Sequence, residues 1–342
     1  MKILVSANNP GGANSLLPVI QQLLKNGEEL IIILEDKARD IFKKAQISFL
    51  DAEGFDKNKI DKLFDENNFH IFLGGSSLGK TIDKKLLDYC KERGLVSICV
   101  LDFWSNYWQR FSTEKKDFKF LPDYICVMDK KAKQDMTKEG FNGDSVIITG
   151  NPCFDHFVDN IKNSHEDKSK ILFVSQPLES LDYGYDELSV LSDTIEALEK
   201  DNINCEVVVR LHPRDKEDKF NKILKKGNVS VFLDENDNLE ESISSSGLIL
   251  GMNSMVLFQS AVAGKKVISY QPNLKVNDCL ISNNLGLSRL ITKKSELTQA
   301  LKDYFLDKDI ISNDMNKDVI IKEATKKVID FIYKAKTYVK KG

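Results

Sequence analysis

The sequence lacks long hydrophobic runs and paired cysteine motifs, and it has no excess of charge of one sign. Its longest apolar stretches, such as residues 30–34, are far shorter than the roughly 20 residues that a membrane-spanning helix needs. The six cysteines form no CxxC pair, and no histidine stands near them at the spacing of a zinc site. A membrane span, a disulfide framework and a structural zinc site are therefore not expected.

The charges are balanced, with 49 Lys and Arg residues against 52 Asp and Glu residues and a formal net charge of -3. This balance gives no reason to expect a nucleic acid as the partner. The chain passes from Met1-Lys2 directly into the apolar residues 3–5, so we expect no signal peptide and a cytoplasmic protein. Near the C-terminus, the lysines at 334, 336, 340 and 341 suggest peripheral contact with the inner face of a membrane. A solvated helix face is the alternative.

Short β-branched runs alternate with longer helical stretches, and this pattern occurs twice along the 342 residues. The first half predicts strands at residues 2–7, 29–34, 47–50, 70–74, 96–101, 124–128 and 146–149, with helices such as 15–26 and 82–93. The second half predicts strands at 170–175, 206–210, 229–233, 247–251 and 266–270, with helices at 187–200, 216–225 and 255–263. Strand–helix alternation with nearly continuous apolar strands indicates parallel sheets covered on both faces.

The expected fold class is therefore α/β, with two Rossmann-like doubly wound domains that face each other across a cleft. We expect an N-terminal domain at residues 1–155, a second domain at 156–317, and a last segment at 318–342. The apolar pattern of this last segment predicts a helix over about 318–340, long enough to leave its own domain and pack back on the first one.

The segment Arg210-Leu211-His212-Pro213-Arg214 directly follows the apolar run 207–209. A buried strand there delivers a histidine and two arginines together at its carboxyl end, where ligands bind in open α/β sheets. Pro213 ends the strand and forces the turn that presents His212. Such a group of donors suits a phosphate better than a neutral ligand.

Other strand ends of the second half add polar residues to the same edge of the sheet. Asn253 and Ser254 end one strand and open a helix, whose first amides form an anion pocket. Gln176 closes the first strand of this domain. Three further residues are candidates to contact a base or ribose: Gln259, Tyr270 and Gln271.

In the first half, two glycine-containing loops follow predicted strands. Gly11 and Gly12, with Asn14 behind them, let the backbone approach a ligand at the start of a helix. The run 74–81 contains Ser76 and Ser77 and matches the P-loop pattern GxxxxGK[ST]. It lies on the fourth strand of its domain, which favours a loop lining a cleft over a true P-loop.

The segment 101–111 is the densest polar and aromatic cluster of the chain. Asp102 follows a buried strand and is our candidate for a general base. Trp104, Asn106, Tyr107 and Arg110 follow it and are candidates to hold an acceptor, with the aromatic rings stacked on a sugar. A helix cap at Asp102 with the aromatic residues in the core is the alternative.

On these residues the chain resembles glycosyltransferases of the GT-B architecture, which consist of two Rossmann-like domains. The segment 251–271 is similar to the donor-binding element of that superfamily, where UDP-sugar enzymes commonly carry a glutamate near the position of Gln259. The segment 210–213 resembles the His-Pro motif of bacterial sialyltransferases, Kdo transferases and related capsule enzymes that use CMP-activated acidic sugars. CDP-glycerol-type polymerases share a similar histidine.

The resemblance implies that residues 1–155 bind the acceptor and residues 156–317 the donor, with His212 and Ser254 on the donor phosphate. We accordingly expect a metal-independent, inverting transferase that moves a CMP-activated sugar, such as Kdo or a sialic-acid-like sugar, to a glycan or lipid-linked saccharide. The nucleotide sugar is then a substrate, and neither a metal nor another cofactor is expected, because no Asp-x-Asp pair occurs near a strand end.

Three alternatives remain open. A UDP-sugar enzyme, either a transferase or a non-hydrolysing 2-epimerase, keeps the fold and changes the donor or the reaction. A P-loop kinase or ATPase would depend on Mg²⁺ and on Lys80. A non-catalytic binding protein would hold its ligand without turnover.

Overall fold

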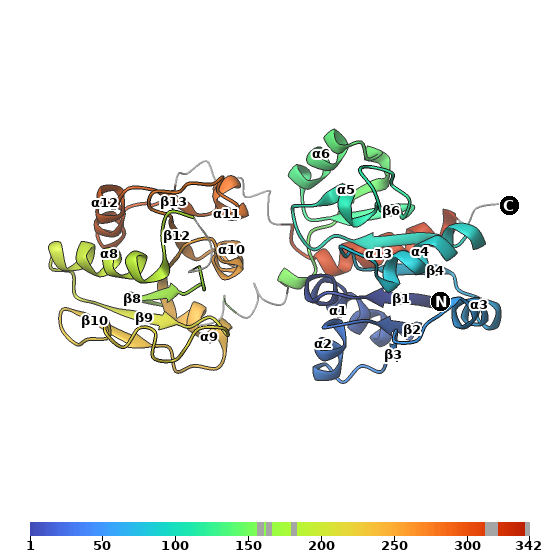
Figure 1. Cartoon of the computed structure of the whole chain (residues 1–342), viewed down its shortest axis with the longest axis horizontal. Coiled ribbons are helices and arrows are strands. Elements are labelled where there is room, and N and C mark those ends of the chain that lie inside the picture. The colour runs from blue at the N-terminus through green and yellow to red at the C-terminus, as the bar shows by residue number, and fades with distance from the viewer. Residues whose placement is uncertain (156–160, 162–165, 179–182, 312–320, 339–342) are drawn as a thin grey trace. The chain divides into compact units, whose positions relative to one another are not determined.

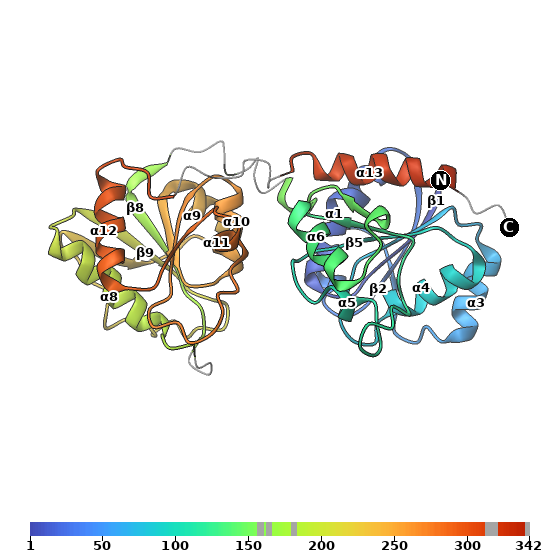
Figure 2. The same cartoon turned by 90° about the horizontal axis from the view of Figure 1, so that it is seen from above.

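The computed structural model describes residues 1–155, 161, 166–178, 183–311 and 321–338. The chain forms two compact units, Met1–Asp155 with Asp318–Gly342 and His156–Lys317, and each is a parallel sheet between layers of helices (Figures 1 and 2). The α/β class with two Rossmann-like domains is confirmed.

The first unit contains a seven-stranded sheet in the order β3-β2-β1-β4-β5-β6-β7. Its strands are β1 (Lys2–Ala7), β2 (Glu29–Leu34), β3 (Leu50–Asp51), β4 (Ile71–Gly74), β5 (Ser97–Val100), β6 (Tyr124–Val127) and β7 (Val146–Ile148). Its helices are α1 (Pro10–Lys25), α2 (Ala38–Lys44), α3 (Lys57–Glu66), α4 (Ile82–Arg93), α5 (Tyr107–Arg110), α6 (Lys130–Glu139) and α13 (Ala324–Ala335), with short 3-10 turns at Gly143–Ser145 and Lys336–Tyr338. All its strand pairs are parallel.

The second unit contains a six-stranded sheet in the order β10-β9-β8-β11-β12-β13, again with parallel pairs. Its strands are β8 (Asp167–Val174), β9 (Cys205–Arg210), β10 (Val229–Leu233), β11 (Ser246–Gly251), β12 (Lys266–Tyr270) and β13 (Arg289–Ile291). Its helices are α8 (Glu187–Lys200), α9 (Leu239–Ser245), α10 (Met255–Val262), α11 (Ile281–Asn284) and α12 (Lys294–Phe305).

Helix α13 packs against α1 and contributes to the core of the first unit (Figure 2). Val328 and Ile332 are fully buried there, because α13 turns an apolar stripe toward the sheet. Asp155 caps the start of α13 by accepting hydrogen bonds from the amides of Ala324 at 3.0 Å and Thr325 at 2.7 Å. The helix begins later and ends earlier than predicted; residues 318–320 and 339–342, including Lys340 and Lys341, lie outside the described residues.

Two local predictions were wrong. The segment 216–225 forms consecutive turns and not a helix; in it Lys219 pairs with Asp215 and Glu187, and Phe220 is fully buried. The strand predicted at 47–50 is reduced to Leu50–Asp51, which pairs only with the end of β2. Strand β13 was not predicted.

Candidate functional site

The strand order of the second sheet reverses between β8 and β11, which lie side by side although the chain runs on from β8 to β9. Ligands of open α/β sheets bind at such a switch point, outside the carboxyl ends of the strands. A pocket of about 610 Å³ lies there. It is lined by Val174, Ser175, Gln176, Pro177, Leu178, Tyr183, Arg210, Leu211, His212, Pro213, Arg214, Leu239, Asn253, Ser254, Met255, Val256 and Cys279.

The loop after β9 is a tight turn stabilised by Asp215. The amide of Asp215 donates to the carbonyl of His212 at 2.8 Å, and the Asp215 carboxylate accepts from the His212 amide at 2.9 Å. The same carboxylate accepts from the Ser175 hydroxyl at 2.6 Å and from the Lys219 ammonium at 2.8 Å. The turn is therefore attached both to the end of β8 and to its own continuation.

Lys219 also pairs with Glu187, and all three charged side chains of this cluster are nearly excluded from solvent. Burial alone would raise the pKa of Asp215, but the Lys219 and Ser175 hydrogen bonds outweigh it, so that the pKa is lowered. The buried ion pairs of this cluster therefore stabilise the turn that carries His212.

The imidazole of His212 is oriented by its own turn. Its Nδ1 accepts a hydrogen bond from the Arg214 amide at 3.1 Å, so the neutral ring carries its proton on Nε2. Partial burial, followed by the positive charge of Arg214, lowers the pKa of His212. At neutral pH the ring is a neutral donor whose Nε2–H is left for a ligand of the pocket.

Gln176 and Asn253 join the ends of β8 and β11. Gln176 Nε2 donates to Asn253 Oδ1 at 2.8 Å, and the backbone N–H of Asn253 donates to Gln176 Oε1 at 2.9 Å. This double contact fixes the carboxamide of Asn253 so that Nδ2 points away from Gln176, toward Cys279 Sγ at 3.3 Å. Asn253 therefore offers a donor, and not an acceptor, to the rest of the pocket.

Ser254 is the N-cap of α10, and its hydroxyl oxygen accepts from the Val256 amide at 3.2 Å. The hydroxyl hydrogen is left to be donated, and the N-terminus of α10 adds a positive partial charge. No acidic residue is among those that line the pocket in the described part of the chain. The polar side of the pocket therefore presents several hydrogen-bond donors and no carboxylate, which suits an anionic ligand.

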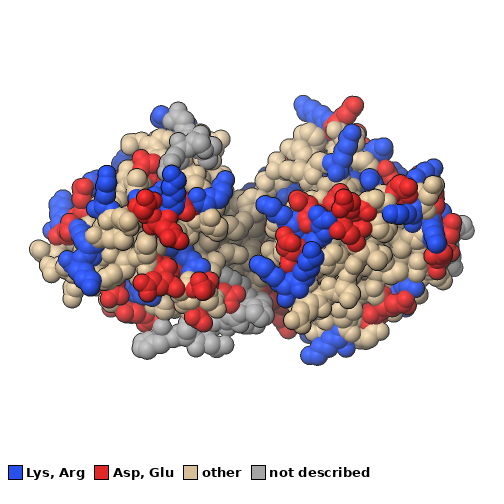
Figure 3. All heavy atoms as spheres, turned by 60° about the horizontal axis from the view of Figure 1, so that its bottom comes forward, with Lys and Arg blue, Asp and Glu red and all other residues tan. Residues whose placement is uncertain are grey.

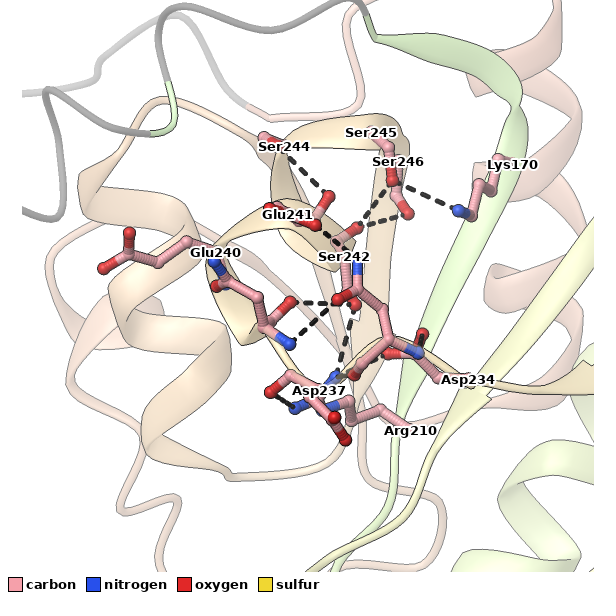
Figure 4. A network of polar contacts seen from close by, with 12 residues as sticks. Lys170, Arg210, Asp234, Asp237, Glu240, Glu241, Ser242, Ser244, Ser245 and Ser246 are labelled. Carbon is pink, nitrogen blue, oxygen red and sulfur yellow. Dashed lines mark hydrogen bonds and ion pairs between the residues drawn. The ribbon is translucent and has the colours of Figure 1, made fainter.

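Arg210 lines the pocket but is engaged elsewhere (Figure 4). Its guanidinium pairs with Asp234 at 2.8 Å, donates to the carbonyls of Asn236 and Asp237, and reaches the Ser242 hydroxyl at 3.3 Å. These contacts of Arg210 stabilise the segment that leads into α9. The phosphate contact that we expected of Arg210 is a different role. Arg214 is exposed, and no ion pair of its guanidinium is found within the residues that the structure describes.

Three of the predicted donor contacts do not line the pocket. Tyr270 is fully buried and donates to Asp193 at 2.8 Å, because the last residue of β12 faces the core. Gln271 is also fully buried, and its Nε2 donates to Asp278 at 2.8 Å. Gln259 is half-buried on α10. Because both side chains are fully buried, neither Tyr270 nor Gln271 can contact a bound nucleotide sugar in this structure.

In the first unit, Asp102 follows β5 and pairs with Arg110 at 2.5 Å through Oδ1. Arg110 is buried and also donates to Ser76 and to the Ser105 carbonyl. No hydrogen bond to Oδ2 of Asp102 is found in the described ranges. This oxygen lies against the start of α1, where a Cβ at Gly11 would stand 1.8 Å from it. The structure thus brings Asp102, Arg110, Ser76 and Gly11 together, as predicted for neighbouring strand ends.

The loops after β1 and β4 pack directly on each other at the switch point of the first sheet. A Cβ at Gly75 would lie 3.3 Å from Cα of Gly12, which explains the need for small residues there. Ser77 and Thr81 are buried, and the Thr81 hydroxyl is enclosed without a partner among the described residues. A P-loop needs this hydroxyl on a Mg²⁺ ion, so the geometry argues against that alternative. Asn14 is exposed on α1.

The aromatic residues of the segment 101–111 belong to the core. Trp104 is 8% exposed and donates through Nε1 to Asp129 at 2.7 Å, and Tyr107 is 3% exposed. Neither ring is free to stack on a sugar, so this expectation is not met and the alternative of core packing describes them. Asn106 is exposed, with φ of 55° at the N-cap of α5.

Four residues that sequence reasoning did not single out shape these sites. Asp215 and Lys219 stabilise the His212 turn, Tyr183 lines the pocket, and Asp83 is buried at the start of α4. The position of Asp215, three residues after His212, is typical of a side chain that closes a turn, and this signal was available. The other three depend on tertiary contacts.

On the face shown in Figure 3, the Lys and Arg side chains of the described residues are interspersed with Asp and Glu side chains. Among the described residues, no group of three or more His, Cys, Asp or Glu side chains could hold a metal ion. No described helix has the length and apolar character needed to cross a membrane.

The sequence matches no protein-family model and no curated protein. The fold, however, is similar to solved structures over nearly the whole chain. UDP-GlcNAc 2-epimerase from Neisseria meningitidis, bound to UDP-GlcNAc, is 14% identical and has a TM-score of 0.73, with 98% of this chain and 100% of that chain covered. UDP-GlcNAc 2-epimerase from Methanocaldococcus jannaschii is 14% identical, with a TM-score of 0.68 and coverages of 99% and 100%. MurG from Acinetobacter baumannii is 13% identical, with a TM-score of 0.63 and coverages of 97% and 99%.

At such low identity these likenesses establish the fold, which is of the GT-B type found in nucleotide-sugar enzymes. They lend no support to the more specific resemblance to sialyltransferases and other CMP-sugar enzymes.

Proposed function

We propose that the chain is a nucleotide-sugar enzyme that binds the phosphates of a UDP-sugar in the pocket at the β8–β11 switch point. The observation that carries this proposal is the wall of donors without a carboxylate, formed by His212, Arg214, Asn253 and Ser254. A nucleoside diphosphate has the negative charge that such a wall would stabilise.

For the reaction we propose epimerisation at C2 of the sugar, as in the UDP-GlcNAc 2-epimerases that share the fold. Inversion at C2 without a redox cofactor can proceed when a base removes the C2 proton while the C1–O bond to the nucleotide breaks. Return of a proton to the opposite face and re-formation of the C1–O bond complete the reaction, so that no water and no acceptor is consumed.

His212 and Arg214 would act on the phosphate that leaves C1, because negative charge develops there as the bond breaks. Asp102 remains our candidate for the base. Arg110 holds its Oδ1, while Oδ2 is left to accept a proton.

The test is to incubate the protein with UDP-GlcNAc in D₂O and to follow the sugar by NMR. Epimerisation requires a second UDP-sugar and deuterium at C2, and it requires no acceptor. His212→Ala should abolish both signals. Binding of UDP-GlcNAc without any exchange at C2 would contradict the epimerase and leave a non-catalytic binding protein or a transferase.

Sugar transfer is the second candidate, favoured by the likeness to MurG, a glycosyltransferase. A transferase would release UDP only when a glycan or lipid-linked saccharide is added, and C2 would keep its proton. A transferase of CMP-activated sugars would instead be stabilised by CMP more than by UDP.

A further inference from the structure

The pocket at the β8–β11 switch point has an aromatic side in addition to its donors. Tyr183 lines the pocket and is half-buried. Its ring stacks on that of Tyr185, with the ring centroids 6.0 Å apart and the planes 19° from parallel. At this separation the two rings are offset, so Tyr185 supports the Tyr183 ring from beside one face and leaves the other face for a ligand.

Tyr185 is a rigid support for this stack. It is buried, and its hydroxyl donates to Gln271 Oε1 at 3.1 Å. Gln271 is itself fixed, since its Nε2 donates to Ser269 Oγ at 2.9 Å and to Asp278 Oδ1 at 2.8 Å. Burial raises the pKa of the Tyr185 hydroxyl, which stays a donor at any working pH. The role of Gln271 is therefore to hold Tyr185 and not to contact a ligand itself.

The backbone beneath Tyr183 is fixed as well. The Tyr183 carbonyl accepts a hydrogen bond from the Lys275 amide at 3.0 Å. The next residue, Gly184, has φ of +93°, and a Cβ there would lie 2.1 Å from the carbonyl oxygen of Asn273. Only glycine allows this approach between the two segments. The ring of Tyr183 is thus positioned by the unit itself before any ligand arrives.

We propose that Tyr183 is the platform on which the nucleobase of the nucleotide stacks; this assignment rests on the proposed function. A planar base can lie parallel to the Tyr183 ring on the side away from Tyr185, and base–aromatic stacking is a general mode of base binding. Apolar side chains of the same lining, Leu178, Leu239 and Val256, suit a flat ring more than a charged group. A sugar phosphate or pyrophosphate would satisfy the donors at His212 and Ser254 without needing Tyr183.

The test compares calorimetric binding of UDP and of inorganic pyrophosphate to the wild type, Tyr183→Ala, Tyr183→Phe and His212→Ala. Tyr183→Ala should weaken UDP binding roughly tenfold, within the range measured for loss of one base–aromatic stack. It should leave pyrophosphate binding unchanged, and Tyr183→Phe should bind UDP like the wild type. His212→Ala should weaken both ligands.

A further variant covers the event that Tyr183→Ala does not fold. In Tyr183→Trp, UDP should quench the fluorescence of the new indole and pyrophosphate should not. Equal loss of both ligands in a folded Tyr183→Ala, or no loss of either, would overturn the platform while the phosphate site stands. If the wild type binds neither UDP nor UDP-GlcNAc, the proposed function fails and the platform fails with it.

Discussion

Gln176 and Asn253 form two hydrogen bonds across the switch point of the second sheet. Gln176 Nε2 donates to Asn253 Oδ1 at 2.8 Å, and the backbone N–H of Asn253 donates to Gln176 Oε1 at 2.9 Å. Each contact uses one donor and one acceptor, so the orientation of both carboxamides is determined by the pair. The ends of β8 and β11, already neighbours in the sheet, are therefore also joined by side-chain contacts at the switch point.

Gln176→Glu should disturb this pair with little change in volume. A carboxylate still accepts from the Asn253 amide but cannot donate to Oδ1, and it brings a negative charge into a pocket that binds an anion. We expect the affinity for UDP to fall more than tenfold in calorimetry. Gln259→Glu is the matched control, since Gln259 lies on α10 outside the pocket and should bind UDP like the wild type. Equal effects of the two changes would contradict this role of Gln176.

His212 should make the binding of UDP-GlcNAc depend on pH. Burial and Arg214 lower the pKa of the free imidazole, whereas bound phosphate stabilises the imidazolium, so that binding takes up a proton. Affinity should therefore rise as the pH falls from 8 to 6, a range in which the sugar-capped diphosphate does not itself titrate. His212→Gln, which keeps a donor but no titration, should weaken binding roughly tenfold and give a flat profile. An unchanged slope in this variant would exclude His212 from the phosphate site.

Much of the second unit could be predicted because strand ends are visible in the sequence. His212, Gln176, Asn253 and Ser254 each follow an apolar run, and parallel strands bring such positions to one edge of a sheet. Their meeting in one pocket follows from the fold class and requires no knowledge of the contacts.

Some side chains predicted to contact the ligand lie at the same strand ends but are bound by other residues. Tyr270 points into the core toward Asp193, and the guanidinium of Arg210 is bound by Asp234, a residue 24 positions later. In this chain most predicted strand ends lie within a residue of the observed ones, whereas the direction of the last side chain of a strand depends on partners from distant segments. Trp104 was misjudged for the same reason, since its partner Asp129 belongs to the next strand–helix connection.

Asp83 should make the first unit less stable as the pH rises. Complete burial raises the pKa of this carboxyl from 3.8 to about 6, and the hydrogen bond from Ser6 at 2.5 Å only partly offsets it. The protonated form is favoured in the folded state, so its stabilisation is fully present below pH 3.8 and is lost as the pH rises through 6. The shift corresponds to roughly 3 kcal/mol at 1.36 kcal/mol per pH unit.

The stability of Asp83→Asn, which is neutral at every pH, should therefore increase relative to that of the wild type as the pH rises from 4 to 7 in urea unfolding. Asp40→Asn, at an exposed position of α2 in the same unit, is the control and should show a constant difference. A constant difference for Asp83→Asn as well would mean that the carboxyl is ionised in the folded protein throughout this range.

Gly11→Ala should displace the carboxylate of Asp102, because the new Cβ would overlap its Oδ2. If Asp102 removes the C2 proton, turnover should fall at least tenfold while the UDP affinity of the second unit is unchanged. Overpacking should also cost about 1–3 kcal/mol of stability. Gly143→Ala is the control, since its nearest contact would be Thr137 Oγ1 at an ordinary 3.7 Å. Full activity in a folded Gly11→Ala would remove Asp102 as the candidate base.

Cys279 should report directly on occupation of the pocket. It is exposed and lines the pocket, whereas Cys90, Cys99, Cys126 and Cys205 are buried and Cys153 is partly buried. Burial raises the pKa of Cys126 to about 12 and that of Cys153 to about 11, which leaves little reactive thiolate at pH 8. Iodoacetamide followed by peptide mass spectrometry should thus find Cys279 modified first. UDP should slow this modification in the wild type, because a nucleotide on Asn253 and Ser254 covers the thiol. In His212→Ala the same protection should need a higher UDP concentration. Unprotected Cys279 under conditions where calorimetry shows bound UDP would place the nucleotide outside this pocket.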